Sequence, residues 1–216
     1  MNIKQSLTTK NVSAGRNTCE YICLHHTATP QWTIKWVLNQ LTVWPVSCHF
    51  VVDTNGDIYR IWQLNQILWH CGKSSWRWRS DMNKYSIGIE IIWPLPWFTD
   101  EQRKSVREIC EFLMQSLNIP KENIIRHKDI SPWRKTDVDD SFWNNEYKTF
   151  KDYQDSYSHN NNLMEDNTTI SEFKAVFDKE KPAGYKQIFS DLSGKKVATI
   201  EDVKLLIEIA NIRNHK

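Results

Sequence analysis

Short apolar runs rich in β-branched and aromatic residues interrupt the polar sequence of the first part of the chain. Residues 19–24 have the composition of a buried strand. Residues 48–62 hold two strand-like runs around an Asn-Gly dipeptide, which favours the backbone angles of a tight hairpin turn. Residues 86–92 are apolar on both faces except at Glu90, so this run predicts a central strand of a sheet.

Helical periodicity alternates with these runs. Residues 99–118 repeat apolar side chains at helical spacing, and Thr99 and Gln102 have the spacing of a capping box at the start. Pro120 follows the end of this predicted helix. Residues 33–41 predict a shorter helix. Because strands alternate with helices, the pattern indicates an α/β domain, which we place at residues 1–150.

The pattern changes after this domain. Residues 151–168 contain few aliphatic and many Asn, Asp and Ser residues, which predicts a polar linker. Residues 169–216 hold three stretches with apolar side chains at helical spacing, which predict a small C-terminal helical module. The tryptophans agree with this boundary, since all 11 lie between Trp32 and Trp143. Most of them are expected in the core.

Composition narrows the functional class. The net charge of +2 and the apolar fraction of 40% favour a packed core and give no basis for electrostatic capture of nucleic acid. No apolar run approaches the roughly 18 residues of a membrane span. The polar start "MNIKQSLTTKN" lacks the apolar region of a secretory signal, so we expect folding in a cytosol. Five cysteines, with no C-x-x-C pattern, predict buried reduced thiols.

Residues 124–140 contain polar side chains that suit a catalytic metal. His127 ends a short strand-like run, and Asp137 follows ten residues later in a predicted loop. A histidine from the pair His25 and His26, at the end of the first strand, completes a set of two imidazoles and one carboxylate. Three such ligands with a fourth position left open are what a catalytic zinc requires.

A hydrolytic metal centre also needs a proton carrier and a cation that stabilises a developing oxyanion. Glu90 suits the first role and Lys135 the second. Each residue also has a structural explanation, because a histidine at a strand end is often satisfied within the fold and Lys135 could simply pair with Asp137. Spacing alone therefore leaves both a metal site and an ordinary loop open.

Five stretches, in order, resemble the type 2 N-acetylmuramoyl-L-alanine amidases, the zinc family that includes phage T7 lysozyme and the peptidoglycan recognition proteins. They are "LHHTAT", "SCHFVVDTNGDIYRI", "WHCGKSSW", "NKYSIGIEI" and "RHKDISPWRKTD", and they cover roughly residues 20–143. The last two are specific to the family. The resemblance implies a central mixed β-sheet flanked by helices, with zinc at one end of the sheet.

The resemblance also implies roles for individual residues. The first zinc ligand of the family directly follows the apolar strand, which implies His25, and His26 then occupies a variable position. Strand alternation agrees that only one of the two faces the site. The other implied roles are Zn²⁺ ligand for His127 and Asp137, acid/base for Glu90 and oxyanion stabiliser for Lys135.

Some positions depart from the family pattern. Several phage members carry a catalytic Tyr where this chain has Cys48, so Glu90 must carry the proton transfer. Asp137 is followed by Val-Asp instead of the common Pro-Gly, which makes Asp139 a competing ligand.

Four further residues match family positions near the cleft or suit stacking on substrate. His49 and His70 either contact substrate or order the site, and Trp69 and Trp76 either stack on sugar or peptide or pack at the rim.

The function implied is a zinc amidase that cuts between N-acetylmuramic acid and L-alanine of peptidoglycan, as a phage endolysin held in the host cytoplasm until a holin releases it. The alternatives are a virion-borne lysin, a cytosolic muropeptide-recycling amidase and a non-catalytic peptidoglycan-binding protein. Loss of a zinc ligand marks the last class, and none is lost here. The C-terminal module is expected to target the wall; the alternatives are docking on the first domain or on another copy of the chain, and binding of a virion or protein partner.

Overall fold

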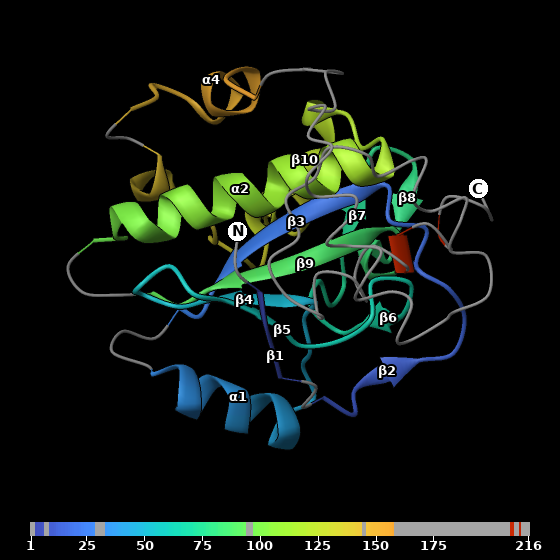
Figure 1. The fold of residues 1–216 in the computed structure, drawn as a ribbon. Helices are drawn as coiled ribbons and strands as arrows, with labels where there is room; N and C mark the ends of the chain where they lie inside the picture. Colours follow the sequence, from blue (N-terminus) through green and yellow to red (C-terminus); the bar gives the residue numbers. More distant parts are fainter. Residues whose placement is uncertain are drawn as a thin grey trace, which may run out of the picture.

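The computed structural model describes residues 3–6, 9–28, 33–93, 97–143 and 146–157, together with 208, 209 and 212. A six-stranded mixed sheet forms its centre (Figure 1). The strands, in spatial order, are β1 (Ile3–Gln5), β5 (Ile58–Arg60), β4 (Phe50–Val52), β9 (Ser86–Ile91), β3 (Tyr21–His26) and β10 (Ile124–Arg126). Only β4 and β5 pair antiparallel, around the predicted Asn-Gly turn. The predicted mixed sheet is confirmed, whereas β1 is an edge strand that the polar N-terminal sequence did not reveal.

The two central strands, β3 and β9, run parallel with His25 opposite Glu90. Alternate residues of β3 face different parts of the core. Ile22 and Leu24 join the main apolar cluster, whereas Tyr21 and Cys23 join a smaller cluster with Cys71. His25 continues the second set because side chains alternate along a strand.

Two helices cover the sheet. Helix α2 (Asp100–Leu117) lies across it in Figure 1, and its buried side chains belong to the same cluster as Ile22 and Leu24. The capping box of Thr99 and Gln102 is present as predicted. Helix α1 (Ile34–Val43) packs Val37 and Leu41 with Val51 of β4, whose neighbours Phe50 and Val52 join the α2 cluster. The two helices therefore cover opposite faces.

Shorter elements complete the domain. Two small ribbons pair β2 (Val12–Ser13) with β6 (Ile67–Leu68) and β7 (Ser75–Trp76) with β8 (Arg79–Ser80). The single-turn helices are η1 (Met82–Lys84), η2 (Lys121–Asn123), α3 (His127–Ile130) and η3 (Asp140–Phe142), and α4 spans Phe150–Asp155. No helix among these elements is long and apolar enough to cross a membrane.

The structure differs from the predicted linker at residues 151–157. Helix α4 occupies the first part of this segment, and Tyr153 and Tyr157 are buried in the main core. Their spacing of four residues puts both aromatic rings on one side of the chain, where the polar composition around them concealed an apolar contact. Residues 158–168 lie outside the described residues, as does the predicted module at 169–216 except at 208, 209 and 212.

The described C-terminal residues contact the first domain. Ile209 and Ile212 are buried in the main cluster, and the Glu208 carboxylate pairs with Arg60 and accepts a hydrogen bond from the Asn65 backbone N–H at 3.1 Å. All five cysteines are free and buried, as predicted. Most tryptophans were expected in the core, but three of their side chains are more than half exposed: Trp78, Trp97 and Trp133.

Candidate metal centre and active site

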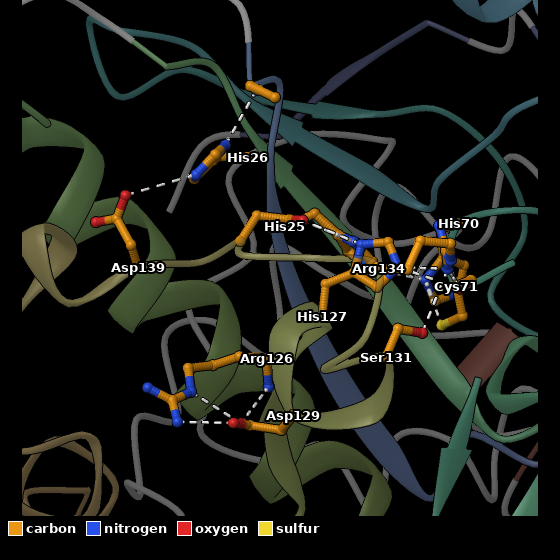
Figure 2. Close-up of polar contacts among 12 residues, drawn as sticks. His25, His26, His70, Cys71, Arg126, His127, Asp129, Ser131, Arg134 and Asp139 are labelled. Carbon is orange, nitrogen blue, oxygen red and sulfur yellow. Dashed lines mark hydrogen bonds and ion pairs between the residues drawn. The ribbon is translucent and has the colours of Figure 1, made fainter. Parts of the chain in front are cut away.

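The adjacent histidines His25 and His26 have different surroundings. His25 points toward His127 and His70, and His26 points toward Asp139 (Figure 2). The His26 ring packs on Trp93, its Nδ1 accepts a backbone N–H, and its Nε2 lies 3.8 Å from Asp139. Of these two adjacent histidines, only His25 therefore presents a ring nitrogen to His127.

His25, His127 and Asp137 bring three ligand atoms together. His25 Nδ1 lies 2.9 Å from His127 Nδ1 and 3.6 Å from Asp137 Oδ2, and His127 Nδ1 lies 3.1 Å from the same oxygen. Ligands about 2.0–2.1 Å from a tetrahedral Zn²⁺ stand about 3.3 Å apart, so the spacing fits zinc. All three residues are buried.

The sheet brings these ligands together. β10 pairs with β3 so that Arg126 lies opposite Leu24; His25 is the next residue of β3, and His127 directly follows β10 as the first residue of α3. The Lys128 backbone N–H donates to the Asp137 carbonyl at 2.5 Å, which holds the loop against α3. Asp137 thus reaches His25 and His127, whereas Asp139 approaches His26.

Hydrogen bonds on the far sides of the rings orient the ligands. His70 Nε2 donates to the Ser86 carbonyl at 3.3 Å, so His70 Nδ1 accepts from His25 Nε2 at 3.0 Å. His127 Nε2 donates to the Cys71 carbonyl at 3.1 Å. Because each far nitrogen is a donor in this arrangement, each Nδ1 is the nitrogen that would present a lone pair to zinc once it carries no proton.

The charge state of the centre also suits a cation. Burial opposes ionisation of Asp137, but its close contacts with His127 and His25 hold the pKa of this carboxyl well below its usual range. Burial and the adjacent His25 lower the pKa of His127 to about 4. Burial opposes protonation of His25, but Asp137 raises the pKa of this imidazole to about 10, so His25 would release a proton when zinc binds. The site therefore offers an ionised carboxylate and a neutral imidazole at His127.

Glu90 and Lys135 line the same cavity as His25, His127 and Asp137. The volume of this cavity is about 200 Å³. Glu90 is the cross-strand partner of His25 and is half-buried. Burial raises the pKa of Glu90 to about 7, although the charges of His25 and Lys135 oppose this shift. A carboxyl that titrates near neutrality suits proton transfer in both directions.

The four residues predicted near the substrate differ in position. Trp69 and His70 line the cavity. Trp69 is 38% exposed and donates from its indole to Ser13 Oγ at 2.8 Å. Trp76 packs with the small apolar cluster around Cys23. His49 is fully buried, accepts from the Gly88 N–H at Nδ1 and approaches the Gln66 carbonyl with Nε2, which favours the site-ordering alternative.

Three features of the site escaped sequence reasoning. Trp44 and Val46 form an exposed apolar wall of the cavity. Arg134 donates to the Cys71 carbonyl at 2.7 Å, the same oxygen that holds His127 (Figure 2). A Cβ atom at Gly88 would lie 2.6 Å from the His70 ring, so only glycine leaves room for that histidine. In the sequence, the one indication of this close contact is a glycine within an otherwise apolar strand.

Known proteins resemble this chain over the segment that contains the candidate site. The family model described as N-acetylmuramoyl-L-alanine amidase matches residues 15–140. The 1,6-anhydro-N-acetylmuramyl-L-alanine amidase AmpD of Haemophilus influenzae is 38% identical over 94 residues, 43% of this chain and 51% of that protein. The N-acetylmuramoyl-L-alanine amidase AmiD of Escherichia coli is 29% identical over 147 residues, which are 60% of this chain and 52% of that protein. The chain thus spans about half the length of these curated relatives.

Solved structures share the fold. The catalytic domain of XlyA superimposes with a TM-score of 0.53 at 29% identity and covers 66% of this chain and 97% of that one. A mutant endolysin from Bacillus subtilis has the same TM-score at 28% identity, with coverage of 66% and 96%.

Proposed function

Because the chain belongs to the N-acetylmuramoyl-L-alanine amidase family, we propose that it hydrolyses the amide bond between N-acetylmuramic acid and L-alanine of the peptidoglycan stem peptide. The observation that carries this proposal is the convergence of His25 Nδ1, His127 Nδ1 and Asp137 Oδ2 in a cavity that also holds Glu90 and Lys135. Three ligands and an adjacent acid/base are the requirements of a hydrolytic zinc site.

The ligand residues fit zinc in type, spacing and orientation. His25, His127 and Asp137 would hold the ion, and His70 and the Cys71 carbonyl would orient the two imidazoles from behind. Zinc bound there would supply Lewis acidity, which activates water and polarises the scissile carbonyl.

The remaining steps belong to the chain's own side chains. The Glu90 carboxylate takes the proton of the attacking water and returns it to the departing amine of L-alanine, and its pKa of about 7 serves both transfers. The Lys135 ammonium faces the same cavity and stabilises the negative charge that develops on the carbonyl oxygen. The indoles of Trp44 and Trp69, which line the same cavity, suit the faces of sugar rings.

Digestion of purified sacculi tests the bond that is cut. Protein carrying one equivalent of zinc should release stem peptides with a free L-alanine amino terminus, which mass spectrometry identifies. Chelation should abolish release and zinc should restore it. Cleavage at another bond, full activity of metal-free protein, or binding without cleavage would contradict the proposal.

Lys135 provides a second test of the same mechanism. Replacing it with Met keeps most of the side-chain volume and removes the charge. Turnover should fall by roughly 10²–10³-fold, the usual loss for one oxyanion donor, while the zinc content stays at one per chain. Lys121→Met, on η2, is the matched control and should leave turnover unchanged.

We further infer that the physiological substrate is polymeric peptidoglycan and that the protein is a bacteriolytic endolysin. The support is the likeness to the XlyA catalytic domain and the Bacillus subtilis endolysin, both nearly completely covered by this chain at 28–29% identity. Release by a holin, a cytoplasmic location before release and association with a virion stay predictions from the family resemblance.

A second candidate substrate is a soluble 1,6-anhydro muropeptide, favoured by the 38% identity to the Haemophilus influenzae amidase over 94 residues. The two substrates are separated by comparing kcat/KM on cross-linked sacculi and on a soluble anhydro muropeptide. An endolysin should clear the sacculi, whereas a recycling amidase should act on the soluble compound alone.

A further inference from the structure

A second group of metal-binding side chains lies behind the proposed zinc centre. Cys23 Sγ, Cys71 Sγ and ring nitrogens of His70 and His25 all lie within 4.8 Å of one another. Cys71 Sγ is 3.2 Å from His70 Nδ1, which is 3.0 Å from His25 Nε2. The proposed amidase reaction uses neither thiol.

The sheet builds this group. Cys23 precedes His25 by two residues, so both side chains lie on one face of β3. The cross-strand partner of Cys23 is Gly88, and the His70 ring occupies the place that a side chain at Gly88 would take. The imidazole therefore comes beside the thiol of Cys23, and Cys71 follows His70 directly in the chain.

We propose that Cys23, His70 and Cys71 form a second metal site, selective for a thiophilic cation such as Cd²⁺, Cu⁺ or excess Zn²⁺. Two thiolates and one imidazole form a soft donor set, which favours these ions over Mg²⁺ or Ca²⁺. At metal–sulfur and metal–nitrogen distances of about 2.3 and 2.0–2.1 Å, tetrahedral donors stand about 3.5 Å apart. The separation of 3.2 Å between Cys71 Sγ and His70 Nδ1 is close to that value, and the ligand atoms of all three residues lie within 4.8 Å of one another. Each thiol releases its proton when the ion binds.

His70 lies between the active-site cavity and the two thiols, and it contacts residues of both sites. It lines the cavity of the proposed active site, whereas Cys23 and Cys71 are fully buried behind it. Its Nδ1 has one lone pair, which either accepts the hydrogen bond from His25 or binds the second ion. Occupation of the thiolate site therefore removes the hydrogen bond that orients His25. By linkage, the two ions weaken each other's binding.

Cadmium titration of zinc-loaded protein tests the site without reference to amidase activity. We expect one Cd²⁺ per chain with the ultraviolet charge-transfer absorption of cadmium thiolate. Cys23→Ser/Cys71→Ser should lose this absorption and bind Cd²⁺ at least tenfold more weakly. Cys48→Ser is the matched control, because it removes a buried thiol of the active-site cavity that is not a proposed ligand, and it should keep the absorption.

X-ray absorption at the cadmium edge of the wild-type protein keeps the test independent of variant folding, and two sulfur neighbours are expected. A spectrum without sulfur, persistence of the absorption in the double variant, or its loss in Cys48→Ser would overturn the proposal. The coupling has its own measurement: zinc should dissociate at least tenfold more readily from cadmium-loaded protein, and unchanged zinc affinity would overturn the shared role of His70. An inactive enzyme that still shows the cadmium signal would contradict the amidase proposal alone.

Discussion

Glu90 lies directly opposite His25 in the parallel pair of β3 and β9, so the proposed acid/base and the first proposed ligand are neighbours on one face of the sheet. The backbone of two central strands fixes their relative position. Glu90 is nevertheless not one of the three groups whose ligand atoms converge. This arrangement separates proton transfer from metal binding.

Glu90→Gln should therefore abolish turnover without loss of zinc. The amide keeps the shape of the side chain but cannot accept the proton, and removal of one positioned acid/base lowers rates by roughly 10²–10⁴-fold. Turnover on sacculi and zinc content by elemental mass spectrometry are measured on the same preparation. Glu122→Gln, an exposed carboxylate on η2, serves as control. Loss of zinc from the Glu90 variant would show that this carboxylate is a ligand.

The two adjacent histidines should behave differently when truncated. His25→Ala removes one of the three converging nitrogen and oxygen atoms, so the zinc content should fall far below one per chain. His26→Ala removes a ring that packs on Trp93, and it should keep zinc with a modest loss of stability. Asp137→Asn and Asp139→Asn form a second pair with the same expected contrast. Zinc loss from His26→Ala or Asp139→Asn, with retention in their partners, would reverse the assignment.

Gly88→Ala should weaken metal binding from a distance. The new methyl group would lie 2.6 Å from the His70 ring, so the ring must shift, which disturbs its hydrogen bond with His25. Loss of such an orienting partner lowers metal affinity by about 10–100-fold. Zinc affinity is measured by competition with a chromophoric chelator. His70→Ala should give a similar loss, and adding Gly88→Ala to it should change little, since both substitutions remove the same hydrogen bond. Additive losses would show that Gly88 acts by another route.

His49 should make the fold sensitive to acid. Burial and the neighbouring His70 lower the pKa of His49 to about 3, whereas a histidine in the unfolded chain titrates near 6.5. The unfolded state therefore binds more protons between these values, and the contribution of neutral His49 to stability is complete above pH 6.5 and is lost as the pH falls toward 3.

The free energy of unfolding should then fall by about 1.4 kcal/mol more per pH unit in the wild type than in His49→Gln between roughly pH 6 and 4. Urea denaturation at several pH values measures both slopes. Parallel curves for the two proteins would contradict the assignment of the acid sensitivity to His49.

The C-terminal segment should contribute to the stability of the first domain. Ile209 and Ile212 are buried in the main core, so Ile209→Ala and Ile212→Ala should each cost about 2–5 kcal/mol of unfolding free energy. Val43→Ala, at a 64% exposed position, is the control and should change stability by less than about 0.5 kcal/mol. Truncation after residue 165 should lower the melting temperature for the same reason. An unchanged melting temperature with poor binding to sacculi would instead support the wall-targeting alternative.

The sequence alone predicted those strands and helices that have a clear local pattern of apolar and capping residues. The strands around His25 and Glu90 are continuous apolar runs, and the helix that Thr99 caps has a capping box and an apolar stripe. Such signals depend on neighbouring residues only, so they survive without knowledge of the fold. Residue type and spacing pointed to His127 and Asp137 as candidate ligands, and the order of the motifs added the family, which favoured a metal site over an ordinary loop.

The tertiary structure decided which of these residues meet and how they are oriented. β10 comes beside β3 only in the folded sheet, and this pairing places His127 next to His25. The tautomers follow from carbonyls of Ser86 and Cys71, which lie far away in sequence from the rings that they hold.

Long-range packing also explains what the sequence concealed. Ile3–Gln5 becomes a strand because the edge of β5 accepts its backbone hydrogen bonds, and Tyr153 is buried because Trp143 and Phe142 supply an apolar surface. Gly88 appears in the sequence as a gap in an apolar strand. Only the fold shows that this gap holds the ring of His70 between the proposed zinc centre and two cysteines, because the contact joins segments that no local pattern connects.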